Sequence, residues 1–317
     1  MSGEKKAHYQ RVKEENKKLI RNLLLKKGVQ GISGLAKESG LSYPTVSNLI
    51  GELAEEKQVL VMEEAESNGG RPGLRYGLNP DYRQGLVLTL MSDRILGVVY
   101  DGCGGIYGKY QESVATDVTA EHIVSIIAGI KAECINLTEV ALGIPGAVNE
   151  CRIIHLPRFP KLMGEELAKQ IEEKLGLSFY LENDLNAIVL TEIEKYHDFA
   201  HIAWIEGCIG VGIVLGGQVL KGSGGYAGEV DGLFQGEEPE YLRLAKCMVA
   251  LICILNLPHI LLSGDIYDEE LVKMALQEVG KRISTERIPE IHIVEDIKGL
   301  CQRGLLERIL QKWRNNI

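Results

Sequence analysis

Short polar or aromatic side chains are concentrated in the stretch SYPTVSN at residues 42–48. None of them is charged, and each can hydrogen-bond to or stack against base edges and phosphates in a DNA groove. A basic side chain, Arg71, follows on the glycine-rich segment 67–73, and arginines carried on such loops enter narrow minor grooves, where the negative potential is strongest. Arg75 is placed to hold a phosphate. The side chains that we expect to contact DNA are Ser42, Tyr43, Thr45, Ser47, Asn48, Arg71 and Arg75.

The apolar residues around this stretch predict the elements that position it. They recur at helical spacing from Ile32 to Ala36 and again from Val46 to Leu53, on either side of the break Gly40-Leu41-Ser42. Ser42 can cap the second helix by accepting from its first free N–H groups, and Pro44 falls in the first turn, where a missing donor costs nothing. The pattern predicts two short helices that meet across a tight turn, the second being the recognition helix.

Two short strands are expected after the helix pair. Residues Val59–Met62 and Leu74–Leu78 have the apolar character of strands, and the segment between them is too polar and too rich in glycine for a core. The order of helix pair, strand, basic loop and strand is typical of a winged helix-turn-helix. A helical pair that packs on another domain is the alternative, but the basic wing favours DNA binding.

The distribution of charge restricts the expected DNA contacts to the N-terminal part. The chain has 317 residues, a net charge of -9 and an apolar share of 45%, enough for more than one core. Residues 1–80 hold 13 Lys and Arg against 10 Asp and Glu, whereas the rest of the chain holds 22 against 34. Because this positive balance is small, we expect a homodimer or higher homo-oligomer on an inverted-repeat operator in double-stranded DNA.

The sequence shows no sign of a membrane segment, a disulfide framework or a metal site. No stretch is long and apolar enough to span a membrane and the first residues are polar, so we expect a cytoplasmic protein without a membrane partner. The seven cysteines have no C-x-x-C spacing and are expected to be reduced thiols. The seven histidines are equally dispersed, so we predict no metal and no other cofactor, although a site assembled from distant residues stays open.

From Leu86 onward the pattern changes to the strands and helices of an α/β domain. Three consecutive antiparallel strands open this region, and paired strands are expected again at Ala200–Ile205 and Gly212–Leu220. These two openings indicate a duplicated unit with a ligand-binding cleft between its halves, so we expect domains at residues 1–80 and 81–317. The three opening strands are Leu86–Met91, Ile95–Tyr100 and Gly105–Glu112. The remaining expected elements are Ala120–Cys134, Val140–Ile144, Leu167–Lys174, Phe179–Glu182, Leu185–Lys195, Tyr241–Leu255, Ile260–Leu262, Asp268–Lys281, Ile291–Val294 and a final helix to Trp313.

Several short motifs, each weak alone, occur in an order and spacing that resemble the ROK family of bacterial repressors and sugar kinases. The motifs are Gly69-Gly70-Arg71-Pro72, Gly143-Ile144-Pro145-Gly146, Glu182-Asn183-Asp184-Leu185-Asn186-Ala187, Gly210-Val211-Gly212-Ile213-Val214, Ala227-Gly228-Glu229 and Leu262-Ser263-Gly264. The resemblance covers nearly the whole chain. It implies the architecture of the family's regulators, in which a winged helix-turn-helix precedes a two-lobed, actin-like and ribonuclease-H-like ATPase-type domain that binds sugar.

The resemblance also implies a sugar site in the cleft. In sugar-binding members, the Asn and Asp of E-N-D-x-N-A and the Glu of A-G-E hydrogen-bond sugar hydroxyls, which here means Asn183, Asp184 and Glu229. Amide and carboxylate groups suit a polyol because each can pair with hydroxyl donors or acceptors. The family's Asp is also the general base of its kinases. The alternative for Asp184 is a structural role as the cap of the following helix.

The chain departs from the family's kinases at both phosphate loops. The first hairpin reads Met91-Ser92-Asp93-Arg94 where kinases have D-x-G-G-T, so it lacks the glycines that allow close approach of phosphate. The second loop, G-T-G in kinases, aligns with Glu206-Gly207-Cys208, whose carboxylate would repel ATP. We therefore predict no enzyme activity, with Asp184 a vestigial general base, and we interpret Gly210 and Gly212 as turn glycines.

The zinc-binding part of the family pattern is missing as well. Gly232 stands where the family has a His that contacts sugar and ligates zinc, and Phe234 leads almost directly into the helix at Tyr241, without the cysteine-rich loop. Three hypotheses follow: a sugar-responsive repressor of carbohydrate metabolism, a DNA-binding regulator with a vestigial cleft, and a divergent sugar kinase. The absent phosphate loops argue against the kinase, and the retained Asn183, Asp184 and Glu229 favour the sugar-responsive repressor.

Overall fold

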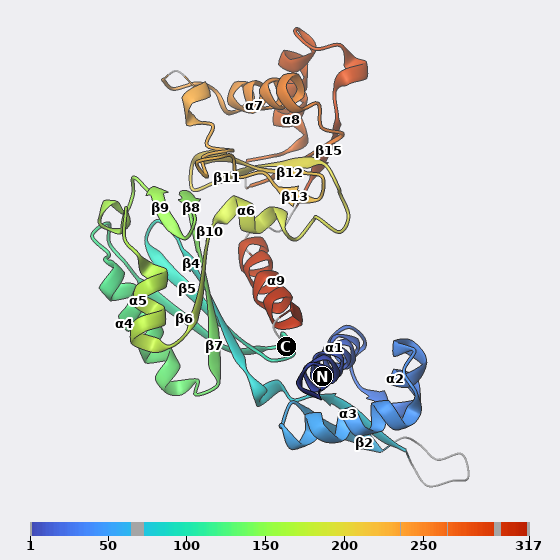
Figure 1. Cartoon of the computed structure of the whole chain (residues 1–317). Helices are drawn as coiled ribbons and strands as arrows, with labels where there is room; N and C mark the ends of the chain where they lie inside the picture. The colour runs from blue at the N-terminus through green and yellow to red at the C-terminus, as the bar shows by residue number, and fades with distance from the viewer. Residues whose placement is uncertain (1, 65–72, 235, 265, 295–298, 316–317) are drawn as a thin grey trace.

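The computed structural model describes residues 2–64, 73–234, 236–264, 266–294 and 299–315, and its N-terminal part is a winged helix (Figure 1). Its elements are α1 (Ser2–Lys27), β1 (Gln30–Gly31), α2 (Ile32–Ser39), α3 (Tyr43–Glu55), β2 (Val59–Glu64) and β3 (Leu74–Leu78). The strands form a small sheet in the order β1-β3-β2. The predicted helix pair and the two strands of the wing are confirmed.

A single apolar core joins α1 to the helix pair. Ile20 and Leu24 of α1 are buried together with Leu35 of α2 and with Val46 and Leu53 of α3. α1 was not expected from the sequence, because most of this helix is charged or polar and its buried apolar residues lie near its C-terminal end. Burial in this core fixes the orientation of the helix pair relative to α1.

The first α/β lobe is a five-stranded sheet in the order β10-β7-β4-β5-β6 (Figure 1). Parallel pairing of β7 with both β4 and β10 makes this a mixed sheet, covered on one face by α4 and α5. The elements are β4 (Gln84–Leu90), β5 (Arg94–Asp101), β6 (Ile106–Ser113), α4 (Ala120–Glu133), β7 (Leu137–Ile144), α5 (Leu167–Leu175) and β10 (Ser178–Asn183), after a short helix at Pro80–Tyr82. A small hairpin that the sequence analysis missed, β8 (Ala147–Asn149) and β9 (Arg152–His155), extends from the end of β7, and a second short helix spans Pro160–Leu162.

The second lobe repeats the sheet of the first. Its strand order is β13-β12-β11-β14-β15. Two antiparallel pairings are followed by two parallel ones, as in the first sheet when that sheet is followed from β6 to β10, which confirms the expected duplication. The elements are β11 (Phe199–Ile205), β12 (Cys208–Leu215), β13 (Gln218–Val219), α7 (Glu240–Leu255), β14 (His259–Ser263), α8 (Glu269–Gly280) and β15 (Glu290–Ile293), with short helices at Asp231–Leu233 and Thr285–Arg287. The single strand expected over Gly212–Leu220 is wrong, because Gly216 and Gly217 both have positive φ and turn the chain between β12 and β13.

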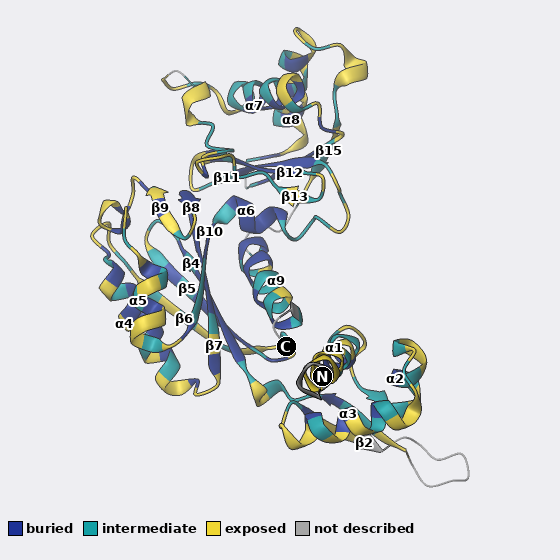
Figure 2. Ribbon diagram, in the orientation of Figure 1, coloured by how far each residue is buried: buried dark blue, intermediate teal, exposed yellow. Residues whose placement is uncertain are grey.

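Two helices connect the parts of the molecule: α6 lies between the two lobes, and α9 lies between α6 and α1 of the winged helix (Figures 1 and 2). α6 (Asp184–Val189) follows β10 and is shorter than the helix expected at Leu185–Lys195, whose later residues form turns. α9 (Leu300–Asn315) packs on the inner face of the first sheet, against α6 and against α1. A Cβ atom at Gly304 of α9 would lie 1.7 Å from the backbone oxygen of Ala187 in α6, so only glycine permits this approach.

None of the helices in the described ranges combines the length and the apolar character that a membrane crossing requires. The boundary expected between residues 80 and 81 falls between the last strand of the wing and the first strand of the α/β region, and it stays a prediction.

Candidate functional site

The N-terminal turn of α3 presents some of the predicted DNA-contacting side chains to solvent and uses others to cap the helix. The hydroxyl of Ser42 accepts from the Thr45 N–H at 3.3 Å and lies 2.8 Å from the Thr45 hydroxyl, so both hydroxyls are engaged within the turn. Tyr43 is 54% exposed, Asn48 is exposed and Ser47 is half-buried. The cap predicted at Ser42 is confirmed, and Tyr43 and Asn48 are exposed predicted contacts outside this cap.

The structure describes one of the two arginines that were predicted to contact DNA, Arg75 but not Arg71. Arg71 lies outside the described residues. The Nη2 atom of Arg75, on β3, donates to the backbone oxygen of Val29 at 2.7 Å, and Gly31 in the next strand pairs with Arg75 in register. Arg75 therefore fastens the wing to the segment between α1 and α2, a structural role that the sequence does not reveal. Its contact with a phosphate stays a prediction.

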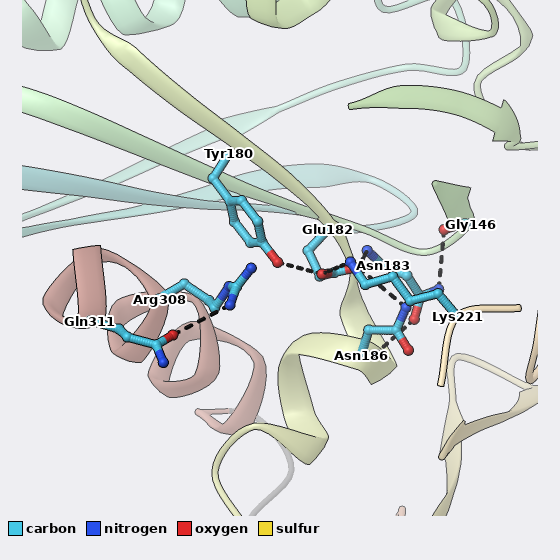
Figure 3. Close-up of polar contacts among 8 residues, drawn as sticks. All are labelled: Gly146, Tyr180, Glu182, Asn183, Asn186, Lys221, Arg308 and Gln311. Carbon is cyan, nitrogen blue, oxygen red and sulfur yellow. Dashed lines mark hydrogen bonds and ion pairs between the residues drawn. The ribbon is translucent and has the colours of Figure 1, made fainter. Parts of the chain in front are cut away.

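The polar network at the end of β10 is centred on Glu182, which is buried (Figure 3). Its carboxylate accepts from the Tyr180 hydroxyl, from the side-chain amide of Asn186 at 3.2 Å and from the ammonium group of Lys221, which comes from the second lobe. The Asn183 N–H also donates to it, at 3.1 Å. A buried carboxylate is tolerated when it is paired and hydrogen-bonded in this way, so Glu182 anchors the start of α6.

Asn183 is the N-cap of α6. Its Oδ1 atom accepts from the Asn186 N–H at 2.9 Å, and its Nδ2 atom donates to the backbone oxygen of Gly146 at 3.1 Å (Figure 3). The cap considered as the structural alternative for Asp184 thus belongs to the preceding residue. Both polar atoms of the Asn183 side chain already have a partner, which restricts this amide to one further hydrogen bond at each atom.

Asp184 is the first residue of α6, and its side chain lies in the region between the lobes. One carboxylate oxygen accepts from the Leu185 N–H at 2.8 Å. Burial first, and to a smaller extent the nearby carboxylates of Glu229 and Glu206, raise the pKa of Asp184 to about 7 despite this bond. The group therefore exchanges its proton near neutral pH, and a hydroxyl-rich ligand could meet it as either a donor or an acceptor.

Glu229 reaches the same region from the second lobe. The residue before it, Gly228, has a φ of +95° and packs so closely on β12 that a Cβ atom would lie 1.9 Å from the backbone oxygen of Val211. Burial raises the pKa of Glu229, while the imidazole of His155 opposes that shift. His155, on β9, makes an edge contact with the ring of Tyr226 at 5.7 Å between centroids.

His155 and Tyr226 are candidate interlobe residues that were not expected from the sequence. They stand on opposite lobes, beside the loop in which Gly225 approaches β8: a Cβ atom there would lie 2.1 Å from the Val148 backbone oxygen. His155 could have been found from its position, 9 residues after the motif residue Gly146. The strand pattern could not identify it, because β8 and β9 are too short to show alternation.

The two hairpin turns expected to bind phosphate in kinases are joined to each other here. Glu206 and Gly207 both have positive φ in the tight turn between β11 and β12, and Glu206 Oε2 accepts from the Ser92 N–H at 3.1 Å. The backbone oxygen of Ser92 accepts from Arg158 Nε, also at 3.1 Å. The two lobes are thus bridged by a carboxylate bound to the backbone of the first hairpin.

Gly210 and Gly212 are not turn glycines, and that interpretation is wrong. Both lie within β12, and neither has a positive φ. A Cβ atom at Gly210 would lie 2.5 Å from Leu185 Cδ1, and one at Gly212 would lie 2.8 Å from the Leu185 backbone oxygen. These glycines let α6, which follows Asn183, pack directly on the second sheet.

On the α9 side of the Glu182 network, a cavity of about 290 Å³ lies between β10, β7 and the C-terminal half of α9. Tyr180, Arg308 and Lys312 are among its lining residues, and the guanidinium of Arg308 stacks on the ring of Tyr180 at 4.7 Å. Neither Asp184 nor Glu229 is among its lining residues.

Comparison with known proteins relates part of this chain to a family. Residues 93–232 match the ROK family, and the xylose repressor of Bacillus subtilis (strain 168) is 24% identical over 230 residues, 69% of this chain and 60% of that protein. The chain is therefore similar to the ROK family over residues 93–232. An N-acetyl-D-glucosamine kinase of Aliivibrio salmonicida (strain LFI1238) is 31% identical over 141 residues, which are 40% of this chain and 47% of the kinase.

The fold of the whole chain has a counterpart among solved structures. The crystal structure of a ROK family transcriptional regulator, a homologue of the Escherichia coli MLC protein, matches with a TM-score of 0.64 at 17% identity, over 96% of this chain and 99% of that one. The expected winged helix followed by a two-lobed domain is therefore confirmed. The chain spans 58% and 60% of the length of two curated xylose repressors that it matches.

Proposed function

We propose that this protein is a sequence-specific DNA-binding transcriptional regulator of carbohydrate metabolism, a repressor that responds to a small sugar. One observation carries the proposal. A single chain combines an exposed recognition-helix surface at Tyr43 and Asn48 with an interlobe site where Asp184 and Glu229 are close enough to raise the pKa of Asp184. The first feature suits DNA and the second suits a ligand with several hydroxyls.

The two interlobe carboxyl groups favour a sugar as the ligand. Both Asp184 and Glu229 are held in partly desolvated positions, and burial raises the pKa of each. Such groups are costly unless hydroxyls or water satisfy them, and the hydroxyls of a carbohydrate supply donors and acceptors at suitable spacing. Because related proteins are named xylose repressors, D-xylose heads the panel of sugars to be tested.

For the DNA partner we propose an operator with an inverted repeat, bound by a homodimer or a higher homo-oligomer. A dimer with twofold symmetry presents two recognition helices to two half-sites separated by whole helical turns. Tyr43, Ser47 and Asn48 would read the major groove, and Arg71 and Arg75 would contact the minor groove or phosphates.

The route from the sugar site to the winged helix is short. Asp184 begins α6, α6 packs on α9 through the close contact at Gly304, and α9 also packs on α1. A sugar that changes how the second lobe meets α6 would therefore bias the position of α9 and, through α1, the spacing of two winged helices. Coupling of this kind is reciprocal, so DNA must change sugar affinity by the same factor.

The absence of kinase activity belongs to the same proposal. The Ser92 N–H is already bonded to the carboxylate of Glu206, which would repel the γ-phosphate of a nucleotide. With no glycines in the first hairpin, Asp184 would act as a proton acceptor without a phosphoryl donor.

A DNA-binding regulator with a vestigial cleft is the second candidate, and one observation favours it. The side chain of Asn183 already donates to Gly146 and accepts from Asn186, so it has fewer hydrogen bonds to offer a sugar. A thermal-shift screen of monosaccharides, amino sugars and their phosphates separates the two candidates, because a ligand of the folded state raises Tm by mass action. A sugar that stabilises the wild type but not Glu229→Gln supports the sugar-responsive repressor, and no response to any sugar supports the second candidate.

A further inference from the structure

A cluster of two histidines and one glutamate lies on the second lobe, at the start of strands β14 and β15. The parallel register pairs His259 with Glu290, and His292 follows Glu290 by two positions. Side chains two positions apart in a strand point to the same face, and paired residues of neighbouring strands share a face. The topology therefore brings His259, Glu290 and His292 together.

The candidate ligand atoms form a nearly equilateral triangle. His259 Nδ1 is 3.4 Å from His292 Nε2 and 3.5 Å from Glu290 Oε2, and His292 Nε2 is 3.6 Å from Glu290 Oε2. The centre of such a triangle is about 2.0 Å from every corner, which matches the lengths of zinc bonds to His nitrogen and carboxylate oxygen. Two neutral imidazoles with one carboxylate are ligands that suit zinc and similar divalent transition metals.

We propose that His259, Glu290 and His292 form a binding site for a divalent transition metal ion of the zinc class. The three protein ligands leave a further coordination position for water, since the Glu290 side chain is 73% exposed and solvent reaches the site from that side. The described ranges contain no other such group of at least three His, Cys, Asp or Glu side chains.

Aromatic packing holds the two imidazoles in place before a metal binds. The ring of Tyr196 lies 4.8 Å from that of His259 and 5.5 Å from that of His292, measured between centroids, and it also packs on Phe199 of β11 at 5.8 Å. The histidine side chains are half-buried, at 27% and 35% exposure. Preorganised ligands lose less conformational entropy on binding, so this packing favours the metal complex.

The site is separate from the interlobe region and from the segment around Gly232, where the chain departs from its family's zinc pattern. It lies at the opposite end of β14 from Gly264, which packs against Trp204 at the end of β11. β15 is the edge strand of its sheet, and a metal ion bonded to both β14 and β15 would fasten that edge strand.

Metal titration of the full chain tests the site. After treatment with a chelator and dialysis, the wild type should bind one equivalent of Zn²⁺ by calorimetry, and about 100-fold excess over Kd should raise Tm by about 5 °C. Co²⁺ should give a ligand-field absorption band that saturates at one equivalent. His259→Ala and His292→Ala should weaken Zn²⁺ binding at least tenfold.

Two further variants keep the test decisive. Glu290→Gln changes an exposed side chain and keeps the fold, so it should weaken Zn²⁺ binding and shift the Co²⁺ band even if a histidine variant fails to fold. His122→Ala is the matched control, because His122 pairs with Glu112 at 2.6 Å without a second histidine, and it should bind Zn²⁺ as the wild type does. Less than one fifth of an equivalent bound, or equal binding by wild type and Glu290→Gln, would overturn the proposal.

Discussion

The carboxylate of Glu206 accepts a hydrogen bond from the backbone N–H of Ser92 at 3.1 Å. Ser92 lies in the turn between β4 and β5, and Glu206 lies in the equivalent turn between β11 and β12, so the bond joins corresponding hairpins of the two lobes. A fixed negative charge at this donor opposes the approach of a phosphate to the same backbone group. The bond therefore links the proposed absence of kinase chemistry to the way in which the lobes are held together.

The first prediction is that the protein does not phosphorylate sugars. Glu206→Gln removes the charge and keeps an acceptor for Ser92, but it should not create activity, because residues 91–94 lack glycines for close phosphate approach. The measurement is coupled ADP release with Mg²⁺ across hexoses and amino sugars. Turnover of the wild type at about 1 s⁻¹ or faster, the lower range for kinases, would contradict the regulator assignment.

The second prediction separates DNA contact from helix capping on α3. Asn48→Ala removes an exposed amide, so it should leave the free energy of unfolding nearly unchanged and weaken specific DNA binding by about 1–3 kcal/mol. Ser42→Ala removes the cap from the Thr45 N–H, so it should lower the free energy of unfolding by about 1 kcal/mol. Urea unfolding and anisotropy titrations of a duplex selected from a random library measure both effects.

The control for Asn48 is Glu55→Gln at the other end of α3, which is exposed and remote from the first turn. It should bind the selected duplex at least as well as the wild type. Equal DNA affinity of Asn48→Ala and wild type would remove this residue from the interface.

The third prediction concerns the stability cost of Asp184. Its folded-state pKa is about 7 and its ordinary value is 3.8, so between these values the unfolded chain has lost a proton that the folded chain keeps. The free energy of unfolding therefore falls as pH rises through this window, by at most about 1.4 kcal/mol per pH unit from this group. Asp184→Asn removes the effect and should be more stable than the wild type at pH 8, on the order of 2 kcal/mol, and similar to it at pH 4.

Denaturant unfolding of both proteins from pH 4 to 8 gives the difference directly, and Asp81→Asn, an exposed residue outside the interlobe region, is the control. A wild type that is as stable as Asp184→Asn at pH 8 would show that Asp184 is ionised without cost.

The fourth prediction concerns His201, a fully buried histidine in β11. Its Nε2 atom lies 2.7 Å from the Ser263 hydroxyl, and burial lowers the pKa of His201 to about 4 from 6.5. Between these values the unfolded chain binds a proton that the folded chain does not, so the free energy of unfolding decreases as pH falls from 6.5 toward 4. His201→Gln should reduce this dependence by up to about 1.4 kcal/mol per pH unit, whereas the exposed His197→Gln should not.

Local signals explain why the helix-turn-helix could be predicted from the sequence. Gly40 ends α2 in the left-handed region at a φ of 72°, and Ser42 and Pro44 begin α3, so each boundary is set by residues adjacent to it. The alternating elements of the lobes could be predicted for the same reason. α1 could not, because its helical state depends on the burial of Ile20 and Leu24 against elements that follow it.

Non-local packing explains what the sequence left out or misassigned at the site. Gly210 and Gly212 carry no sign that α6 packs on them, and the Glu182 network depends on Lys221, 39 residues away along the chain. The His259, Glu290 and His292 cluster arises from the parallel pairing of β14 with β15, which no spacing in the sequence reveals. Asn183, Asp184 and Glu229 were identified by motif, and their contact with sugar stays a prediction.

The measurement that tests the central claim most directly is the affinity for the selected duplex, by fluorescence anisotropy, with and without a saturating sugar that raises Tm in the thermal-shift screen. The proposal predicts a change of about 5- to 150-fold in the Kd for DNA in the wild type, with the same factor for sugar binding when DNA is saturating. It also predicts that Asp184→Asn and Glu229→Gln bind DNA normally without sugar and lose the response. A Kd for DNA that no sugar changes, or variants that respond as the wild type does, would contradict it.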